Sequence, residues 1–291
     1  MPDRPGIRTY HFNSPFGGWR VSVMDAPPDL APAVAEFWDT SGRFAFAREQ
    51  LLPRGSIFLV FNLGTAQRRH DCGRDITRLP RAYLWGLQDG PVWTVPDGGT
   101  GPFDGASVGA RLYAGGAAAL FGLPGSELRG RALALDDILP AARVDRLLDR
   151  VARNTSPAGR IGIVTAFLRG LGALRSDAVI DWTVAMIREG RGGLPVSHIA
   201  DAAGLSRRVL SRRFHERTGM GPKRYGRLVK FFSAVEMIKP ARTVDWAGVA
   251  ADAGYYDQAH MIRDFREFAG CTPAHFLRQR AADGETIVEL R

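Results

Sequence analysis

The feature that most constrains this chain is a near-repeat of a helix–turn–helix pattern in its C-terminal third. The first copy spans residues 199–225 and the second spans residues 249–276. Four residues recur at an offset of 50 or 51 positions: Gly204 as Gly254, Phe214 as Phe265, Gly219 as Gly270, and Pro222 as Pro273. A helix, a glycine-containing turn and a second helix form the arrangement that places a recognition helix in the major groove of DNA. The repeat therefore predicts a unit that reads two successive major-groove faces, roughly 34 Å apart along the duplex.

Positive charge is concentrated in the same segment. The 291 residues carry a formal net charge of +9. Residues 195–280 contain 15 Lys and Arg against 8 Asp and Glu, whereas residues 1–187 carry a net charge of only about +3. A basic patch confined to one segment favours a phosphate backbone as partner. Charge alone leaves the alternative of a merely solvated basic face open.

The second helix of the first copy has one apolar and one basic side. Ser206 can cap its N-terminus, and Leu210 and Phe214, four residues apart, belong on the buried face. Arg208 and Arg212 fall nearly opposite that face. Beside them lie Ser211 and His215, and the buried stripe is flanked by Arg207 and Arg213. Guanidinium groups bind guanine edges bidentately or contact phosphates, so this side is the predicted DNA-reading side.

The second copy follows the same frame with fewer cations. Met261 and Phe265 take the core positions, and Arg263 corresponds to Arg212. The first turn of this helix, nearest the groove floor, carries Asp257, Gln258 and His260. Gln and His can hydrogen-bond base edges, whereas Asp257 can either face DNA or cap the helix. We expect weaker or more sequence-tolerant reading by this copy.

A long helix over residues 223–239 is expected to join the two copies. Gly219 should end the preceding helix in a left-handed conformation, and Pro222 should begin the new one. Four cations crowd its first two turns: Lys223, Arg224, Arg227 and Lys230. Phosphate contact and simple solvation both remain open for these side chains.

The N-terminal part is predicted to be rich in β-strands up to about residue 118 and helical from there to about residue 188. Expected strands are residues 56–63, 82–87, 92–95 and 107–113, with the middle two forming a hairpin around a turn at 88–91. An early helix is expected at 30–39, after Pro27 and Pro28. Later helices are expected at 117–121, 142–153, 161–174 and 178–188.

Aromatic residues are the candidate ligand-binding groups of this part. Trp38, Phe61, Trp85 and Trp93 lie on expected strands or on the early helix and either line an apolar pocket or fill the core. A metal site would need clustered ligands, and the run His70, Asp71, Cys72 has no second histidine cluster to complete it. Because nucleophile and phosphate-binding motifs are also missing, we expect no cofactor and no enzyme activity.

The chain shows no sign of export or membrane insertion. Its two cysteines, Cys72 and Cys271, are far apart in sequence, which argues against a disulfide framework and favours a reducing compartment. No apolar leader and no run of 18 apolar residues is present. These observations predict a cytoplasmic protein.

The C-terminal residues resemble the AraC/XylS family of bacterial transcription regulators. The motifs that carry the resemblance are IADAAGLS, LSRRF, TGMGPKRY, VAADAGYYDQ, FREFAG and TPAHF, in this order between Val196 and Arg278. The resemblance implies two helix–turn–helix subdomains joined by one helix. It implies base-facing roles for Arg207, Arg208, Ser211, Arg212, Asp257, Gln258, His260 and Arg263. Met261, where the family usually has an aromatic residue or Leu, is a departure confined to the core.

The N-terminal part resembles, more loosely, a regulatory domain of that family with a degenerate cupin-type barrel. The motifs are PPDLAPAVAEFW, LPRGSIFLVFNLG, ARLYAGGAAALFGLPGSEL and LALDDIL. The resemblance implies effector sensing or dimerisation. The resulting expectation is a transcription regulator, in the first instance an activator, with double-stranded DNA, a small effector, RNA polymerase and a second copy of itself as partners. Control by a protein partner without a small ligand is the alternative, and a cupin-type enzyme with a DNA-binding tail is a distant one.

The expected fold class is α+β, with a β-rich, cupin-like barrel and following helices, then an all-α domain of two helix–turn–helix subdomains joined by a long helix. The expected divisions are a β-rich sensor at 1–118, a helical connecting or dimerisation segment at 119–187, a Gly-rich linker at 188–195, the DNA-binding domain at 196–280 and a frayed tail at 281–291. We expect the helices between about 136 and 187 to carry a signal from sensor to linker.

Overall fold

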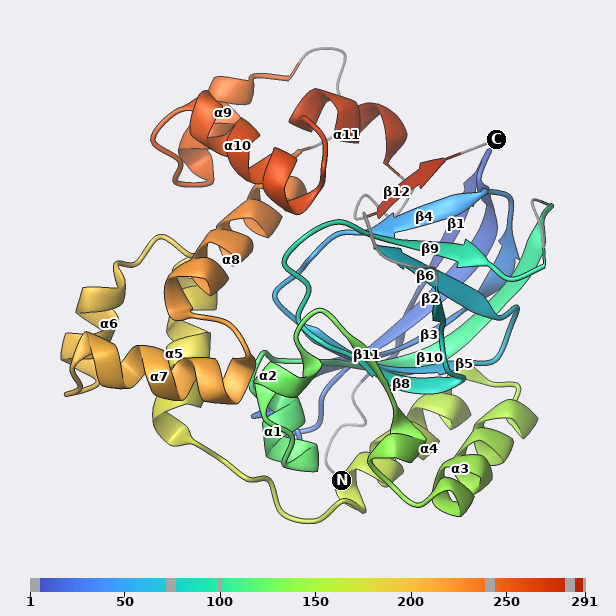
Figure 1. Ribbon diagram of the computed structural model, residues 1–291. Helices are drawn as coiled ribbons and strands as arrows, with labels where there is room; N and C mark the ends of the chain where they lie inside the picture. Colours follow the sequence, from blue (N-terminus) through green and yellow to red (C-terminus); the bar gives the residue numbers. More distant parts are fainter. Residues whose placement is uncertain (1–5, 72–76, 99–100, 239–243, 281–285, 290–291) are drawn as a thin grey trace.

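The N-terminal half of the protein consists of two facing β-sheets, and the C-terminal part is helical and lies beside them (Figure 1). The computed structural model describes residues 6–71, 77–98, 101–238, 244–280 and 286–289. Within these ranges the first sheet has seven strands in the order β1-β2-β3-β10-β5-β8-β11, and the second has five in the order β12-β4-β9-β6-β7. The fold is therefore α+β with a cupin-like barrel, as the sequence predicted.

The strands of the first sheet are β1 (Arg8–Ser14), β2 (Gly17–Asp25), β3 (Val34–Phe44), β5 (Ile57–Asn62), β8 (Ala82–Trp85), β10 (Phe103–Leu112) and β11 (Ala132–Ala134). Those of the second are β4 (Arg48–Leu51), β6 (Gln67–Asp71), β7 (Thr77–Arg78), β9 (Val92–Pro96) and β12 (Thr286–Glu289). The strands expected at 56–63 and 107–113 are confirmed as β5 and β10.

Alternating side chains give the first sheet two different faces. The outer face is apolar and covered by helices; from β5 it takes Ile57, Leu59 and Phe61. The inner face looks toward the second sheet; from β5 it takes Phe58, Val60 and Asn62. This alternation decides which aromatic residues can reach the interior of the barrel.

Five helices connect the barrel to the C-terminal part: α1 (Gly116–Phe121), α2 (Gly125–Leu128), α3 (Ala141–Arg153), α4 (Pro157–Arg169) and α5 (Ala178–Glu189). Helix α4 packs on β3 and β10. A buried carboxylate, Asp39 of β3, faces Arg160 of α4 at 3.3 Å and Arg20 of β2 at 3.6 Å. Burial raises the pKa of Asp39, and the two guanidinium groups oppose that rise.

The C-terminal part contains the two predicted helix–turn–helix units. The first is α6 (Val196–Ala202) with α7 (Arg207–Thr218), the second is α9 (Trp246–Asp252) with α10 (Gln258–Phe268), and α8 (Pro222–Met237) joins them. Helix α11 (Pro273–Gln279) follows. The expected caps are confirmed, because Ser206 accepts from the backbone N–H of Val209 at 3.3 Å and Gly219 has a φ of 78°. No helix in the described ranges has both the length and the apolar character needed to cross a membrane.

The helix expected at residues 30–39 is wrong. After a turn in which Pro27 accepts from the backbone of Leu30, the chain enters β3, which pairs with β2 on one side and β10 on the other. The spacing of Val34, Phe37 and Trp38 fits a helix face, but a central strand buries Phe37 outward and turns Trp38 inward. Long-range pairing on both edges overrides the local pattern.

The hairpin expected from 82–87 and 92–95 is also wrong, although both strands exist. Strand β8 pairs with β5 and β11, whereas β9 pairs with β4 and β6, so the intervening residues cross from one sheet to the other. Gln88 in this crossing is buried, donates to the carbonyl of Gly86 at 2.8 Å and accepts from Arg69 at 3.1 Å. A crossing between the sheets, in which Gln88 is buried and hydrogen-bonded, replaces the expected hairpin turn.

The tail expected to fray after Arg280 is corrected as well. Residues 286–289 form β12 at the edge of the second sheet, antiparallel to β4. Its Ile287 and Val288 are both buried. The pairing with β4 brings together residues far apart in the sequence, so the local sequence does not predict it.

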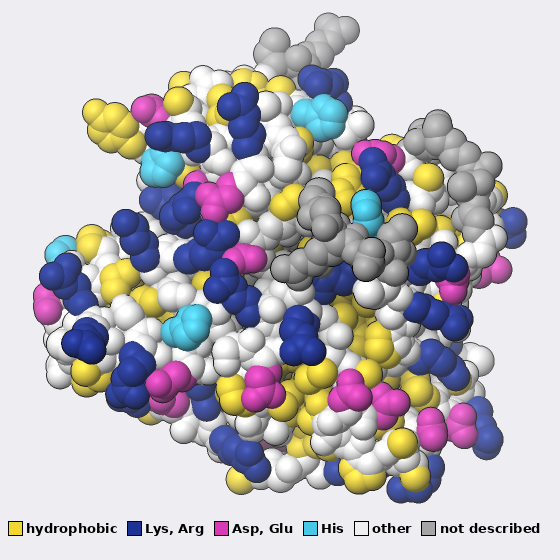
Figure 2. Space-filling view, in the orientation of Figure 1, with side chains coloured by type: hydrophobic (Ala, Val, Ile, Leu, Met, Phe, Trp, Pro, Cys, Tyr) yellow, Lys and Arg dark blue, Asp and Glu magenta, His cyan; other side chains and the backbone are white. Residues whose placement is uncertain are grey.

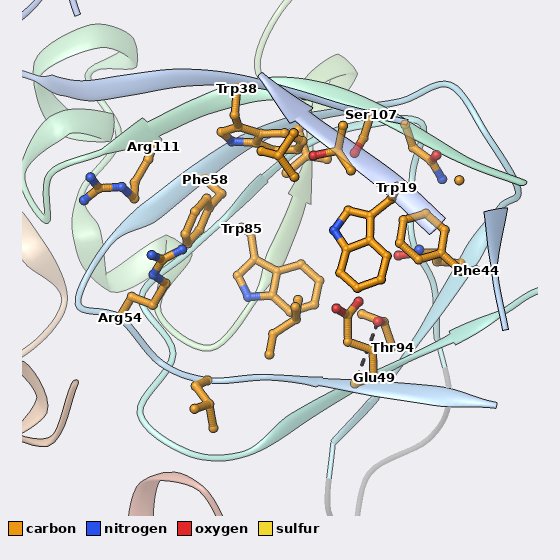
Figure 3. A pocket seen from close by; sticks show the side chains of 18 of the residues that line it. Trp19, Trp38, Phe44, Glu49, Arg54, Phe58, Trp85, Thr94, Ser107 and Arg111 are labelled. Atoms are coloured by element: carbon orange, nitrogen blue, oxygen red, sulfur yellow. Dashed lines mark hydrogen bonds between the residues drawn. The ribbon is translucent and has the colours of Figure 1, made fainter. Parts of the chain in front are cut away.

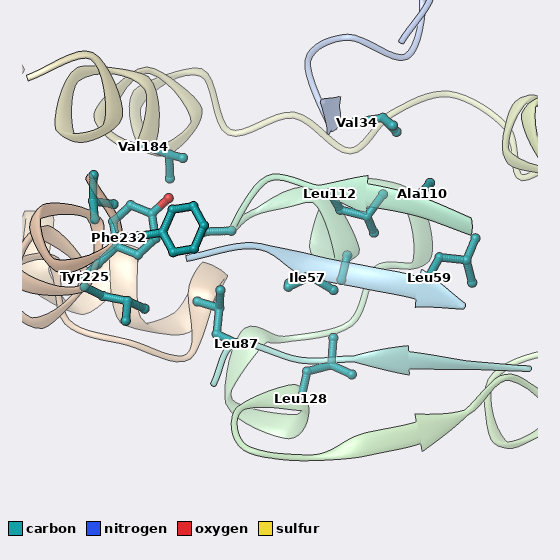
Figure 4. Close-up of a cluster of buried hydrophobic side chains, with 14 of the residues drawn as sticks. Val34, Ile57, Leu59, Leu87, Ala110, Leu112, Leu128, Val184, Tyr225 and Phe232 are labelled. Carbon is teal, nitrogen blue, oxygen red and sulfur yellow. The ribbon is translucent and has the colours of Figure 1, made fainter. Parts of the chain in front are cut away.

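The helical part is packed tightly onto the barrel and its helices. Gly219, at the end of α7, lies so close to Gly125 of α2 that a Cβ on Gly219 would sit 2.3 Å from the carbonyl oxygen of Gly125. Tyr225 of α8 is buried and donates its hydroxyl to the carbonyl of Gly55 at 3.2 Å. Figure 4 shows Tyr225 and Phe232 in one cluster with sheet residues such as Ile57. The expected linker is also packed, with Gly192 against Gly226 of α8.

Candidate DNA interface and barrel cavity

Helix α7 divides its arginines between the outside and the rest of the protein. Leu210 and Phe214 are fully buried, and Arg207 and Arg208 are exposed. Arg212 is exposed too and pairs along the helix with Glu216 at 3.2 Å. Ser211 is half-buried. Arg208 and Arg212, which the sequence placed opposite the core stripe, are thus exposed, and so is Arg207, which was expected to flank it.

Two further arginines of α7 hold it against α5. Arg213 pairs with Asp177 at 2.8 Å, and Arg217 donates to the carbonyl of Arg175 at 2.6 Å and faces Asp181 at 3.4 Å. These contacts fix α7 to the helices that follow the barrel. They also occupy two cations that the sequence alone would count as available for DNA.

The first turn of α10 presents a different set of side chains. Asp257 accepts from the backbone N–H of His260 at 2.7 Å, so its carboxylate caps the helix in this structure. Gln258 and Arg263 are exposed, and the His260 ring stands edge-on to Tyr255, with centroids 5.2 Å apart. The sequence reasoning missed Tyr256, which is 94% exposed directly before the cap. An aromatic residue between the turn glycine and the capping Asp was the available signal.

The cations of α8 are engaged within the protein. Arg224 pairs with Asp89 at 3.0 Å and with Glu267 of α10 at 2.8 Å. Arg227 pairs with Glu267 at 2.5 Å and with Asp264, also of α10, at 2.6 Å. Partial burial opposes ionisation of Glu267, yet the hydrogen bonds and charges of Arg227 and Arg224 hold its pKa below the usual glutamate value. Arg224 and Arg227 are thus neither simply solvated nor free to contact phosphate in this structure, because both are held in ion pairs within the protein.

Lys223 and Lys230 differ from them. Lys223 is exposed, whereas Lys230 donates to the carbonyl of Gly254 at 2.9 Å and lies over the Tyr255 ring. A groove of about 380 Å³ runs between the two units, and its lining includes Arg207, Lys223, Arg227, Lys230 and His260. Figure 2 shows Lys and Arg side chains gathered over this helical part of the molecule. Apolar side chains such as Leu194 line the same groove, and so does the Asp264 carboxylate.

A second candidate site is a cavity of about 770 Å³ between the two sheets. Figure 3 shows Trp19, Trp38, Phe44, Phe58 and Trp85 projecting into it. Strand alternation explains the selection, since each of these side chains comes from the inner face of the first sheet. Aromatic rings in mutual contact, such as Trp19 and Phe44 with centroids 5.6 Å apart, make most of its wall apolar.

Polar and charged side chains also line the cavity, among them Glu49, Thr94 and Ser107. Arg111 pairs with Glu36 at 2.8 Å, and Arg54 lies near them (Figure 3). Partial burial opposes ionisation of Glu36, but Arg111 holds its pKa below the usual value. The indole N–H of Trp38 is buried and has no hydrogen-bond partner among the described residues. Burial, helped by the Glu49 carboxylate, raises the pKa of the Tyr83 hydroxyl.

The four aromatic residues singled out from the sequence are split by the structure. Trp38 and Trp85 line the cavity. Phe61 lies on the outer face of the first sheet, edge-on to Phe167 of α4, and Trp93 lies under the guanidinium of Arg48. Phe61 and Trp93 are therefore not lining residues. The period-two alternation of 56–63 would have selected Phe58 in place of Phe61.

Metal-ligand geometry is not seen in the described ranges, where no group of three or more His, Cys, Asp and Glu side chains could hold a metal ion. His70 lies on β6, while Cys72 and the Asp71 side chain fall outside the described part. Cys271 is a free thiol, and burial raises its pKa to about 11.

Comparison with known proteins assigns the two parts of the chain separately. Residues 199–279 match the model of a helix-turn-helix domain family, and residues 22–134 match a domain of unknown function (DUF6597). No curated protein matches the chain.

Solved structures of regulators resemble the chain at low identity. ToxT from Vibrio cholerae aligns with a TM-score of 0.50 and 10% identity, over 83% of this chain and 98% of that one, which shows a shared fold. ToxT from V. cholerae strain SCE256 with bound unsaturated fatty acid aligns with a TM-score of 0.48 and 9% identity, over 83% and 94%. A transcriptional regulator with an AraC-type DNA-binding domain from Chromobacterium violaceum aligns with a TM-score of 0.33 and 22% identity, over 36% and 93%. The chain therefore carries a helix-turn-helix domain at residues 199–279 and shares the overall fold of ToxT.

Proposed function

We propose that α7 and α10 read bases in two successive major grooves and that a small ligand in the barrel cavity controls this reading. The sensor would comprise residues 1–187 and the DNA reader residues 196–280, joined by the segment 188–195. The observation that carries the proposal is an aromatic-lined cavity of about 770 Å³, within the range of small-molecule sites, in the same chain as two helix–turn–helix units.

The ligand chemistry follows from the lining. Trp19, Trp38 and Trp85 offer flat apolar surfaces, which favours a largely apolar or aromatic body. The buried indole N–H of Trp38 favours a ligand with a hydrogen-bond acceptor, because an unsatisfied buried donor is unfavourable. The ion pair of Arg111 and Glu36 offers polar contacts near one end.

The DNA contacts are assigned by exposure. Arg207, Arg208 and Arg212 would read bases or phosphates from α7, with Ser211 beside them, while Gln258, His260 and Arg263 would act from α10. Lys223 would contact phosphate. Arg224, Arg227 and Lys230 would contribute only if DNA draws them from their present partners, and Asp257 would act through its cap.

Two experiments test these assignments. Genome-wide mapping of bound DNA, with wild-type protein and with Arg208→Ala, should yield a motif whose base preference weakens in one half-site. Mass spectrometry of small molecules released from purified protein, compared between wild type and Trp38→Phe, should reveal an apolar ligand whose recovery falls with the variant. A motif that is unchanged, or a cavity that retains nothing and binds no apolar probe, would refute the corresponding half.

A regulator controlled through self-association is the second candidate. In the described residues β1 pairs with β2 on one side only, and Tyr10 on β1 is half exposed. Such an edge offers backbone groups to a strand of a second copy. Analytical ultracentrifugation with and without Tyr10→Asp tests this. We also propose that the protein contacts RNA polymerase after it binds DNA, as an activator would.

A further inference from the structure

The last strand, β12, belongs to the DNA-binding half of the chain by sequence and to the barrel by structure. It pairs with β4 so that Val288 lies opposite Glu49 and Glu289 opposite Arg48. The backbone N–H of Ala47 donates to the carbonyl of Glu289 at 2.9 Å, and the Arg48 guanidinium pairs with the Glu289 carboxylate at 2.7 Å. Figure 1 shows β12 following α11 and completing the second sheet beside β4. The strand connects the two parts of the protein.

Successive side chains of β12 serve the two parts differently. Val288 is 3% exposed, packs with Phe46 and Phe103, and lines the barrel cavity. Ile287 is buried in the main core, which includes Phe276 of α11. A ligand that fills this end of the cavity therefore contacts a residue continuous in the chain with the second helix–turn–helix unit.

Strand β4 has the same two-sided arrangement. Its Glu49 and Leu51 line the cavity. Between them, Gln50 is buried and donates its amide to the carbonyl of Ala269, directly after α10, at 2.8 Å. A single strand thus separates the cavity from the end of the second recognition helix.

We propose that β12 forms part of the ligand site and that a ligand in the cavity holds the second helix–turn–helix unit against the barrel through this strand. The inference rests on the proposed ligand-binding function of the cavity. The ligand end that reaches Val288, Phe46 and Phe103 meets three apolar side chains, and Glu49 lies opposite Val288 in the same part of the lining. When β12 leaves β4, that part of the wall is lost, so a ligand binds the docked arrangement more tightly and shifts the population toward it.

We call this coupling of the cavity to the second unit through β12 (Thr286–Glu289) the tether. It predicts a different response from a signal carried by residues 136–187. Within that segment α3 and α4 contact each other, α4 contacts the first sheet, and α5 contacts α7 and α8. A signal through α5 would affect α7 of the first unit most. A signal through β12 affects α10 of the second unit most, which makes the two routes separable by local measurements.

Hydrogen exchange of the full-length protein with the fluorescent probe 8-anilinonaphthalene-1-sulfonate (ANS), an anion with apolar aromatic rings, tests this coupling through β12. At a free ANS concentration ten times its dissociation constant, we expect amides of β12 and α10 to exchange up to about tenfold more slowly. This limit applies if the undocked form binds no ANS. Amides of α7 should change little. Val288→Ala should remove most of the slowing. Its matched control is Val60→Ala, the same truncation in the same cavity but on β5, which should weaken ANS binding to a similar extent and keep the slowing.

A reversible cross-link provides a second test. Residues opposite each other in antiparallel strands have Cα atoms about 4.5–5.5 Å apart, within the range of a disulfide. Arg48→Cys with Glu289→Cys, in a Cys72→Ser background, would join β4 to β12 at positions that do not line the cavity. The oxidised protein should show slow α10 exchange without ANS and no further slowing with it, and reduction should restore the response.

The outcomes separate the two proposals. Saturable ANS binding that leaves α10 exchange unchanged, or equal loss of slowing in Val288→Ala and Val60→Ala, overturns the tether and leaves the ligand site intact. An oxidised cross-link that still responds to ANS also overturns it. Absence of saturable ANS binding by the wild-type protein instead refutes the cavity function, and the ligand-controlled tether falls with it.

Discussion

The carboxylate of Asp264 offers the sharpest test of how the two helix–turn–helix units are held together. It is 1% exposed and accepts from Arg227 of α8 at 2.6 Å and from the Tyr255 hydroxyl at 3.2 Å. Glu267, one turn further along α10, accepts from the same guanidinium at 2.5 Å but is 35% exposed. Asp264→Asn and Glu267→Gln therefore remove one charge each from the surroundings of the same arginine, at very different burial.

The expected magnitudes differ because of that burial. Removing one partner of a buried pair destabilises a protein by about 3–5 kcal/mol. Asn keeps an acceptor for Tyr255, and Arg227 keeps Glu267, so we expect about 2–3 kcal/mol for Asp264→Asn, close to one charge-assisted hydrogen bond. A pair open to solvent contributes about 0–1 kcal/mol, and because Glu267 is only partly buried we expect a loss near the upper end of that range for Glu267→Gln.

Urea unfolding followed by tryptophan fluorescence measures both values, and Trp246 on α9 lies within the affected unit. Unchanged slopes with a lower midpoint would indicate a change in stability alone. DNA affinity should fall with Asp264→Asn, since the position of α10 relative to α8 depends on this pair. An Asp264→Asn midpoint equal to wild type, or a larger loss for Glu267→Gln, would refute burial as the deciding factor.

Three further outcomes are expected. Arg212→Ala should weaken the preferred DNA site by about 1–3 kcal/mol and relax base preference, whereas Lys223→Ala should weaken all sequences alike, as competition binding would show. The pKa of Glu267 is lower in the folded state, so its stabilisation is present above about pH 4.5 and is lost as pH falls. The urea midpoint of Glu267→Gln should therefore depend less on pH below about pH 5 than that of the wild-type protein. Trp85→Ala should weaken ANS binding, and Trp93→Ala, of equal size but outside the lining, should not.

The helix–turn–helix units could be predicted from the sequence because their determinants are local. Ser206 caps α7 within its own first turn, and Leu210 and Phe214 define a buried face through a spacing of four residues. The ion pairs of the same helices could not be predicted. Arg224 finds Asp89, which is 135 positions away, and no local pattern indicates that such partners will meet.

The barrel could be predicted only as a collection of strands. The runs that became β5 and β10 were recognisable, but the sheet to which each strand belongs depends on pairings over long separations. Arg48 and Glu289 are 241 positions apart, which is why residues 286–289 looked like a loose end. Trp38 and Trp85 line the cavity, as one of the two sequence-based alternatives predicted. Phe61 and Trp93 do not, and the alternation of side chains along each strand had not been used to separate the two groups.

The ion pairs also limit how many phosphates the protein neutralises. Arg213 of α7 is paired with Asp177, whereas Arg208 of the same helix is exposed and has no acidic partner among the described residues. Each phosphate neutralised adds about 0.9 to the slope of log affinity against log salt. Arg208→Ala should therefore lower the slope by about 0.9. Arg213→Ala should leave the slope unchanged while reducing stability, because Asp177 loses its ion-pair partner and keeps only the backbone N–H of Ile180 among the described residues. Fluorescence anisotropy at several salt concentrations gives both slopes. An equal decrease for the two variants would mean that Arg213 leaves Asp177 for DNA, and the ion pairs of the free protein would then not determine the salt dependence.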